Sequence, residues 1–219
     1  PVRIIGSNIG ESSFEGCNSF TELVIGEEKT DLMELTEFKT IEKRAFYGVK
    51  VTGSLYIHSS INIIEEYAFS NAQMSSVNVN IFAGQINPFA FANAGTINNL
   101  NIYSETVCFH AFDGCTITNL VIDYKDPLME ENSDPRLEEQ AFYGLTITNL
   151  DISNEYTIDQ LAFSKCNFKG SLKIDSKEIY PYAFSCCESS SSCTVDIGDC
   201  NIQKFAFMNF SSISRLTFF

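Results

Sequence analysis

The sequence of 219 residues contains no tryptophan, only two histidines and only 14 lysines and arginines. The histidines, His58 and His110, are too few and too far apart in the chain to form a histidine-rich metal site. Because 28 acidic residues leave a net charge of −14, nucleic acid and anionic membranes are poor candidates for the main partner. No apolar run approaches the roughly eighteen residues that a membrane-spanning helix requires, and no signal peptide is visible.

Familiar catalytic patterns are also missing. The sequence has no Gly-x-Ser-x-Gly segment, no phosphate-binding loop and no dinucleotide fingerprint. Cys108 and His110 stand two residues apart, but closeness in sequence does not supply the spatial arrangement that a thiol–imidazole pair needs. We therefore predict a non-enzymatic protein with no catalytic residues, no metal site and no cofactor.

What the sequence has instead is an internal repeat. A phenylalanine, preceded by alanine in eight of nine copies, recurs every 21–23 residues apart from two longer steps of 32 and 30 residues. The nine repeat phenylalanines are Phe14, Phe46, Phe69, Phe91, Phe112, Phe142, Phe163, Phe184 and Phe207. A repeat of this length is typical of a solenoid, in which each unit forms one coil of a stack.

Three further features recur at nearly constant spacing from the phenylalanine. An aliphatic residue stands five positions before it in every copy, and glycine or asparagine stands two positions after it in seven of nine copies. Those two residue types adopt a left-handed backbone at little cost, so a tight turn is expected there. Eight to eleven residues after the phenylalanine comes an alternation such as Leu55-x-Ile57, which in the third unit we assign to Val77-x-Val79. An alternation of period two predicts a short strand with one buried face.

Stacking explains why the units repeat. A unit of about 22 residues cannot bury its own apolar face, whereas stacked copies place phenylalanine on phenylalanine and leucine on leucine. Each buried ring removes about 150–250 Å² from water, which is a few kcal/mol at ~25 cal/mol per Å². We predict one solenoid domain over residues 1–219, of about nine to ten coils, with a parallel sheet of short strands. The fold class is mainly β, with short helical or 3-10 turns.

An extended apolar frame carries a family resemblance. The pattern Ile97-x-x-Leu100-x-Ile102 recurs at residues 117–122, 147–152 and 213–218, and it has the spacing of a leucine-rich repeat core. Together with the aliphatic-x-x-x-Ala-Phe-x-Gly/Asn segment, it closely resembles the BspA-like (Treponema-type) leucine-rich repeat family of bacterial and protist surface proteins. The resemblance covers essentially the whole chain. Two departures are that no proline follows the Leu-x-Ile strand and that two repeats carry long insertions.

The resemblance implies a function and a location. Members of the family act in adhesion or ligand capture at cell surfaces, so a non-enzymatic recognition module with a protein or glycan partner is the expectation. A cell-surface or secreted location is implied in the same way, while the residues themselves leave a cytoplasmic location open.

The two insertions are acidic and directly follow predicted strands. Residues 26–40 carry a net charge of −3, and residues 123–140 carry −5. They are either solvated loops that interrupt the coil or a docking feature for a basic partner or calcium. The sequence does not contain the Asp-x-[Asp/Asn]-x-[Asp/Asn]-Gly pattern of known calcium loops, which argues against a calcium site.

Both ends of the chain fall within predicted strands. Val2-Arg3-Ile4 and Leu216-Thr217-Phe218 match the strand pattern, and neither is joined to a polar capping unit. Two interpretations remain open. The chain is a piece of a longer array, or it self-associates end to end through Phe218 and Phe219, which would make it a structural, self-assembling protein.

The eight cysteines divide by their place in the repeat. Cys17, Cys115, Cys166 and Cys187 stand three residues after the phenylalanine, where small apolar residues occur in other units, so we expect them to act as small hydrophobes. A bond between Cys166 and Cys187 is conceivable because their coils are adjacent. A local bridge from Cys193 to Cys186 or Cys187 is also open. Cys108 and Cys200 occupy mostly polar positions and are expected to face water.

The outward side chains of the predicted sheet form the candidate binding surface. The densest polar and aromatic set, spread over three adjacent coils, is Tyr56, His58, Asn78, Asn80, Asn101 and Tyr103. Amide and phenol groups on a rigid sheet suit hydrogen bonding to a peptide or a sugar, although a simply solvated face is the plain alternative. Asn99, Asn119 and Asn149 recur just before the strands, and we expect them to form a structural ladder that satisfies backbone groups between coils.

Overall fold

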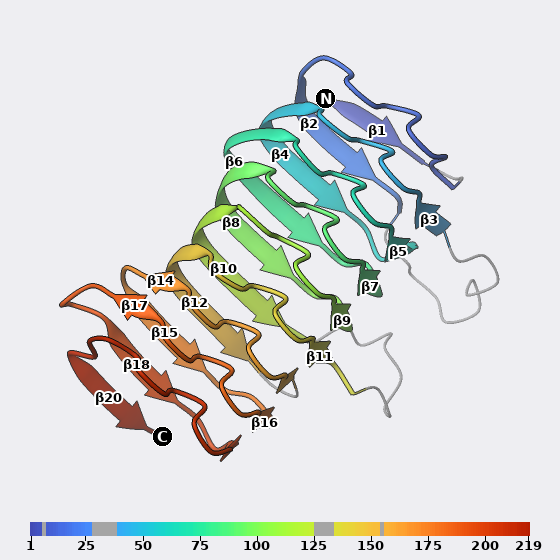
Figure 1. The fold of residues 1–219 in the computed structure, drawn as a ribbon. Coiled ribbons are helices and arrows are strands. Elements are labelled where there is room, and N and C mark those ends of the chain that lie inside the picture. Colours follow the sequence, from blue (N-terminus) through green and yellow to red (C-terminus); the bar gives the residue numbers. More distant parts are fainter. Residues whose placement is uncertain (6–7, 28–38, 125–133, 154–155) are drawn as a thin grey trace.

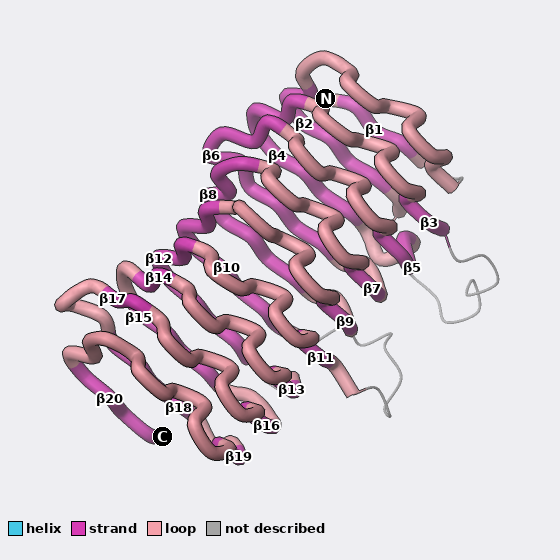
Figure 2. Tube along the Cα trace, viewed as in Figure 1, coloured by secondary structure: helices cyan, strands magenta, loops and turns pink. Residues whose placement is uncertain are grey.

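The structure is a computed structural model, and it describes residues 1–5, 8–27, 39–124, 134–153 and 156–219. The described chain winds into a stack of coils, with its two ends at opposite ends of the stack (Figure 1). The strands of a larger sheet form one side of the stack, and loops and turns form the opposite side (Figure 2). This arrangement is the predicted repeat solenoid with a parallel sheet.

The larger sheet receives one main strand from each coil, and all its pairs are parallel. In spatial order its strands are β1 (Val2–Ile4), β2 (Phe20–Ile25), β4 (Lys50–Ile57), β6 (Gln73–Ile81), β8 (Gly95–Ile102), β10 (Thr116–Asp123), β12 (Thr146–Ser153), β15 (Ser171–Ile174), β18 (Thr194–Ile197) and β20 (Arg215–Phe218). Two short strands, β14 (Asn167–Phe168) and β17 (Glu188–Ser189), extend the sheet beside β12. The strands predicted at both ends of the chain are therefore present as β1 and β20.

A second parallel sheet, which the sequence analysis did not predict, runs along a neighbouring side of the stack. Its strands are β3 (Lys39–Ile41), β5 (Ile61–Ile64), β7 (Gln85–Ile86), β9 (Thr106–Val107), β11 (Arg136–Leu137), β13 (Thr157–Ile158), β16 (Glu178–Ile179) and β19 (Asn201–Ile202). The aliphatic residue found five positions before the phenylalanine is the buried residue of each of these strands except β19, where Ile202 is exposed. Strands of two residues are too short to show an alternation in the sequence.

The register corrects one predicted strand. Val79 lies opposite Leu55 on one side and Leu100 on the other, so the third unit contributes Val79-x-Ile81 rather than Val77-x-Val79. One extra residue at an irregularity near Ser76, whose φ is 57°, places Val79 ten residues after Phe69, whereas Leu55 and Leu100 stand nine residues after their phenylalanines. A shift of two residues keeps the same side chains on the same face, so periodicity alone cannot distinguish the two assignments.

The repeat phenylalanines form a single column through the core. Successive ring centroids lie 4.9–5.6 Å apart and their planes agree within 9°. The seven rings from Phe46 to Phe184 are fully buried. Their backbones are joined as well, because the N–H of Phe46 donates to the carbonyl of Ala68 in the next coil (2.8 Å) and Phe142 donates to Ala162 (2.8 Å).

The segment around each phenylalanine is a pair of tight turns. The residue two positions after the phenylalanine has a positive φ in all nine copies, as predicted, including the copies with Lys165 (59°) and Cys186 (54°). The residue two positions before it also has a positive φ in all nine copies, although bulky side chains such as Tyr67 and Leu161 stand there. This second position carries no glycine or asparagine, so no residue type marked it as a turn position.

The predicted helical or 3-10 turns are wrong for the described residues, which contain neither type of helix. Instead, each turn is closed by a bond across three residues, such as Ala45 N–H to Glu42 C=O and Val49 N–H to Phe46 C=O. The residue before the donor is left-handed in both turns, and a left-handed residue ends any right-handed helical run.

All eight cysteines are free thiols, so the bridges considered for Cys186, Cys187, Cys193 and Cys166 are not formed. Buried Cys166 donates its S–H to the carbonyl of Phe142 in the preceding coil (2.9 Å), and Cys115 and Cys187 make the equivalent bond. The expectation that Cys108 faces water is wrong. Its side chain is buried beside the smaller sheet, where Gln85 donates to its sulfur (3.5 Å).

Most of the two acidic insertions, residues 28–38 and 125–133, lies outside the described residues. In the part that is described, no helix is long and apolar enough to cross a bilayer.

Candidate functional site

The central outward row of the larger sheet holds three of the predicted site residues in register. Tyr56 lies opposite Asn80, and Asn80 lies opposite Asn101, on strands β4, β6 and β8. The Nδ2 of Asn101 donates to the Oδ1 of Asn80 (2.8 Å). The parallel backbone ladder therefore brings these three side chains together on one face, although the prediction placed Asn78 rather than Asn80 between Tyr56 and Asn101.

A second outward row lies where the same strands end. The backbone N–H of Phe82 donates to Ile57 (2.9 Å), and that of Tyr103 donates to Ile81 (2.9 Å), which places His58, Phe82 and Tyr103 side by side. Each of these side chains is two residues beyond a member of the central row, so it points to the same face of the sheet.

The rings of the two rows touch one another. The ring centroid of Tyr56 lies 4.4 Å from that of His58 and 5.4 Å from that of Phe82. The Phe82 ring stacks on Tyr103, with centroids 4.3 Å apart and planes 11° apart. We call these four residues the aromatic patch. All four are partly exposed, which makes the patch a continuous apolar surface with phenol and imidazole groups in it.

Phe82 is the member that sequence reasoning missed. Because the third strand was placed two residues too early, Asn80 was assigned to the strand-end row that Phe82 occupies. The signal was available: Phe82 follows the alternation Val79-x-Ile81 just as Tyr103 follows Leu100-x-Ile102.

Asn78 does not join the patch. It lies in an earlier row with Asn99, Asn119 and Asn149, where the amides of the last three each donate to the asparagine of the preceding coil at 2.7–2.8 Å. The predicted ladder is therefore present, but its bonds run mainly from side chain to side chain. Among the described residues, a backbone group bonds to the ladder only at its end, where Asn149 accepts from the N–H of Ser171 (3.1 Å).

Charged residues occupy the outward rows further along the stack. Asp151 pairs with Lys173 (3.5 Å), and Asp196 pairs with Arg215 (3.2 Å), each across neighbouring strands. In the central row the uncharged set is bordered by Val24 and Val121. In the strand-end row, by contrast, the acidic residue Asp123 follows Tyr103 in the next coil.

The structure separates the sequence neighbours Cys108 and His110 into different environments. Burial, with Glu138 nearby, raises the pKa of the Cys108 thiol to about 12. The His110 ring meets Gln140 (3.1 Å) and Asp113 (3.4 Å) instead of the thiol. A thiol that stays protonated at neutral pH is a poor nucleophile.

Comparison with known families places the chain. It belongs to the BspA type leucine rich repeat region family, which it matches in six copies over residues 7–128 and 136–219. No curated protein and no solved structure matches the chain. Leucine-rich repeat families are generally protein-interaction or adhesion modules and are typically non-enzymatic.

Proposed function

We propose that the chain is a recognition module that binds a protein partner through the aromatic patch and the adjoining amides of Asn80 and Asn101. The observation that carries the proposal is the direct contact of four partly exposed rings at the ends of three adjacent strands. Aromatic residues are enriched in the cores of protein interfaces and at the positions that dominate binding energy.

The patch is already arranged for binding. Its rings pack on one another and its strands are fixed by the backbone ladder, so little side-chain freedom remains to be lost on association. A standard interface covers about 800 Å² on each partner. The patch would therefore be the centre of a larger contact, with the flanking sheet face as its rim.

The charge of the chain favours one kind of partner. With a net charge of −14, the module repels acidic proteins and attracts basic ones, chiefly through the rate of association. A cell-surface or secreted location agrees with this role, and it is part of the proposal.

A crosslinking experiment tests the proposal. A photoreactive residue replacing Phe82 should capture the partner from an extracellular protein mixture, whereas the same residue at Tyr143, on the turn side, should not. Binding of the captured protein is then measured with purified variants. Phe82→Ala together with Tyr103→Ala should weaken it about 100-fold or more, as expected for central interface residues. Tyr143→Ala serves as the control and should leave it unchanged.

The opposite results would refute this function. Binding within about threefold of wild type in the folded double variant would place the contact elsewhere on the chain. Binding that disappears when glycans are removed from the captured protein would mean that a glycan, rather than a protein surface, is recognised.

End-to-end self-association is the second candidate, and one observation favours it. Leu216 and Phe218 on the edge strand β20, and Phe219 directly after it, are 50–63% exposed. Exposed apolar edges of this kind promote pairing with another chain. Sedimentation velocity over a range of concentrations should then show growth that Phe218→Asp with Phe219→Asp abolishes; a constant monomer mass would remove this candidate.

A further inference from the structure

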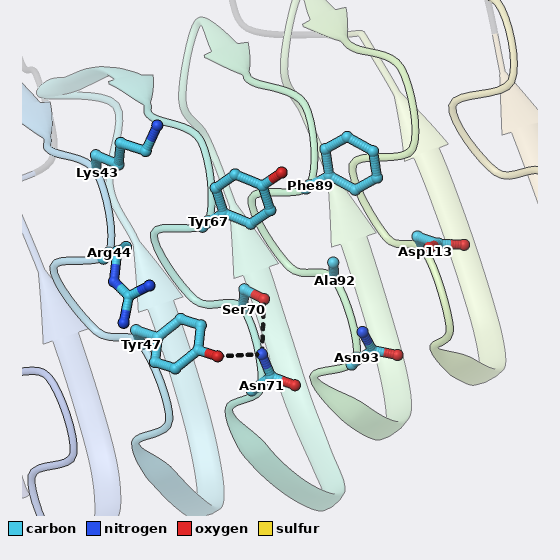
Figure 3. Close-up of a pocket in the computed structure, with 10 residues that line it drawn as sticks. All are labelled: Lys43, Arg44, Tyr47, Tyr67, Ser70, Asn71, Phe89, Ala92, Asn93 and Asp113. Atoms are coloured by element: carbon cyan, nitrogen blue, oxygen red, sulfur yellow. Dashed lines mark hydrogen bonds between the residues drawn. The ribbon is translucent and has the colours of Figure 1, made fainter.

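A hollow of about 430 Å³ lies on the turn side of the stack, away from the aromatic patch (Figure 3). It spans neighbouring coils and is lined by residues from the pairs of turns that flank the repeat phenylalanines. The strands of the larger sheet lie behind it in the view. Its volume falls within the range of small-molecule sites in proteins.

The repeat itself explains why the hollow exists. Its floor is formed by Ser70 and Ala92, which occupy the position just after the phenylalanine in two consecutive coils and are both buried. The same position holds the longer residues Tyr47 and Asp113 in the coils on either side. Two small residues between two large ones leave a depression about two coils long, or roughly 10 Å at ~4.8 Å per coil.

One wall of the hollow is aromatic. The rings of Tyr67 and Phe89 lie side by side along it, 5.5 Å apart and parallel within 7° (Figure 3). Both residues have a left-handed backbone, with φ of 60° and 59°, which is rare for bulky side chains. Phe89 also contacts Phe109 and His110, and His110 occupies the equivalent position of the next coil. The wall is thus a fixed apolar surface.

The other wall carries amides. Asn71 donates both amide hydrogens, to the hydroxyl of Tyr47 (2.8 Å) and to Ser70 (3.2 Å), which leaves its Oδ1 to accept from a ligand (Figure 3). Asn93 stands in the equivalent place of the next coil, and the Asp113 carboxylate lies beyond it. These groups supply both donors and acceptors along the hollow.

The charges around the hollow are already compensated. Lys43 pairs with Glu66 (3.1 Å), and Arg44 pairs with Glu15 while lying over the Tyr47 ring. An anionic ligand would therefore have to compete with these carboxylates, in a protein of net charge −14. An apolar ligand would cover the Asn71 amide oxygen and leave it without a hydrogen-bond partner, which is unfavourable.

We infer that this hollow is a binding site for a short neutral saccharide. A pyranose ring offers an apolar C–H surface to the rings of Tyr67 and Phe89, and its hydroxyls both donate and accept hydrogen bonds. The donors can meet the oxygens of Asn71 and Asp113, and the acceptors can meet the amide of Asn93. The site shares no residue with the aromatic patch, so it holds or fails independently of the proposed function.

The test is a titration of the full chain with neutral sugars, namely glucose, galactose, mannose, N-acetylglucosamine and their disaccharides, followed by saturation-transfer NMR and calorimetry. At least one should bind saturably. Ala92→Tyr should fill the hollow and abolish binding, and it should fold because Tyr47 and Tyr143 occupy the same place in other coils. Asn71→Ala should weaken binding about tenfold through the loss of one acceptor.

One control and one reserve variant accompany the test. The control, Tyr103→Ala, removes an aromatic ring from the other side of the stack and should leave sugar binding unchanged. Tyr67→Ala removes a ring from the hollow and replaces Ala92→Tyr if that variant does not fold. The inference is overturned if none of the sugars binds, if binding survives in the folded Ala92→Tyr or Tyr67→Ala variant, or if sialic or uronic acids bind better than every neutral sugar.

Discussion

Phe112 and Phe142 stack in the core with centroids 5.6 Å apart and planes within 5°, although thirty residues separate them in the chain. The other steps of the column measure 4.9–5.1 Å. The second acidic insertion falls between these two residues. The column therefore continues across the insertion, and this step is its widest.

The wide step should be visible in hydrogen exchange. The amide of Phe91 donates to the carbonyl of Ala111 in the next coil (2.8 Å), whereas within the described residues the amide of Phe112 has no such bond to Ala141. We expect the Phe112 amide to exchange at least about tenfold faster than that of Phe91 in the native protein. Equal protection measured by NMR would show that the two steps are equally closed.

Stability should depend on the buried ring and much less on its exposed sequence neighbour. Phe112→Ala removes a fully buried side chain from the column and should lower the free energy of unfolding by about 3–5 kcal/mol. Phe109→Ala, the matched control, truncates a ring that is 39% exposed and should cost less than about 1 kcal/mol. Urea unfolding followed by circular dichroism compares the two, and similar losses would contradict the column as the source of stability.

Two turn glycines should differ in their tolerance of alanine. Gly144 has a φ of 71° and open space around its Cα, so Gly144→Ala should cost about 1 kcal/mol through the backbone alone. Gly114 has nearly the same φ, but a Cβ there would meet the side chain of Asn93. Gly114→Ala should therefore cost more, and thermal melts of the two variants test the order. A neutral Gly144→Ala would show that the turn tolerates alanine without strain.

Buried thiols should make the fold sensitive to alkaline pH. Burial raises the pKa of Cys115 to about 12 from an ordinary value of 9.0. Between those values the unfolded chain holds fewer protons than the native one, so the free energy of unfolding falls as pH rises, by up to about 1.4 kcal/mol per pH unit for each such thiol. Below pH 9 the thiol makes its full contribution to the free energy of unfolding.

A pair of variants isolates this effect in urea unfolding measured from pH 8 to 11 under reducing conditions. Cys115→Ala, which copies Ala94 of the preceding coil, should make the free energy of unfolding fall less steeply with rising pH, and Ala94→Cys should make it fall more steeply. If neither variant changes the slope, ionisation of these thiols does not limit alkaline stability.

The sequence alone was sufficient to predict the solenoid, the stacked phenylalanines and the left-handed residue after each of them. No single coil can cover Phe69 or Leu100, so the only way to bury such a repeated apolar position is beneath the same position in another coil. Glycine and asparagine marked one turn position because their backbone preference is a local property. The alternation of side chains along a strand likewise predicted that Tyr56, Asn101 and Tyr103 share one face of the sheet.

Only the tertiary structure decided the remaining features, because they depend on contacts between coils. Tyr67 and Leu161 are left-handed against their own preference, in turns that hydrogen bonds to the neighbouring coils hold in place. The irregularity at Ser76 sets the register that brings Phe82 between Tyr56 and Tyr103. The apolar alternation could not predict this register, because a shift of two residues leaves the alternation unchanged. The hollow above Ser70 and Ala92 likewise arises from the sizes of residues in four successive coils, which meet only when the stack is formed.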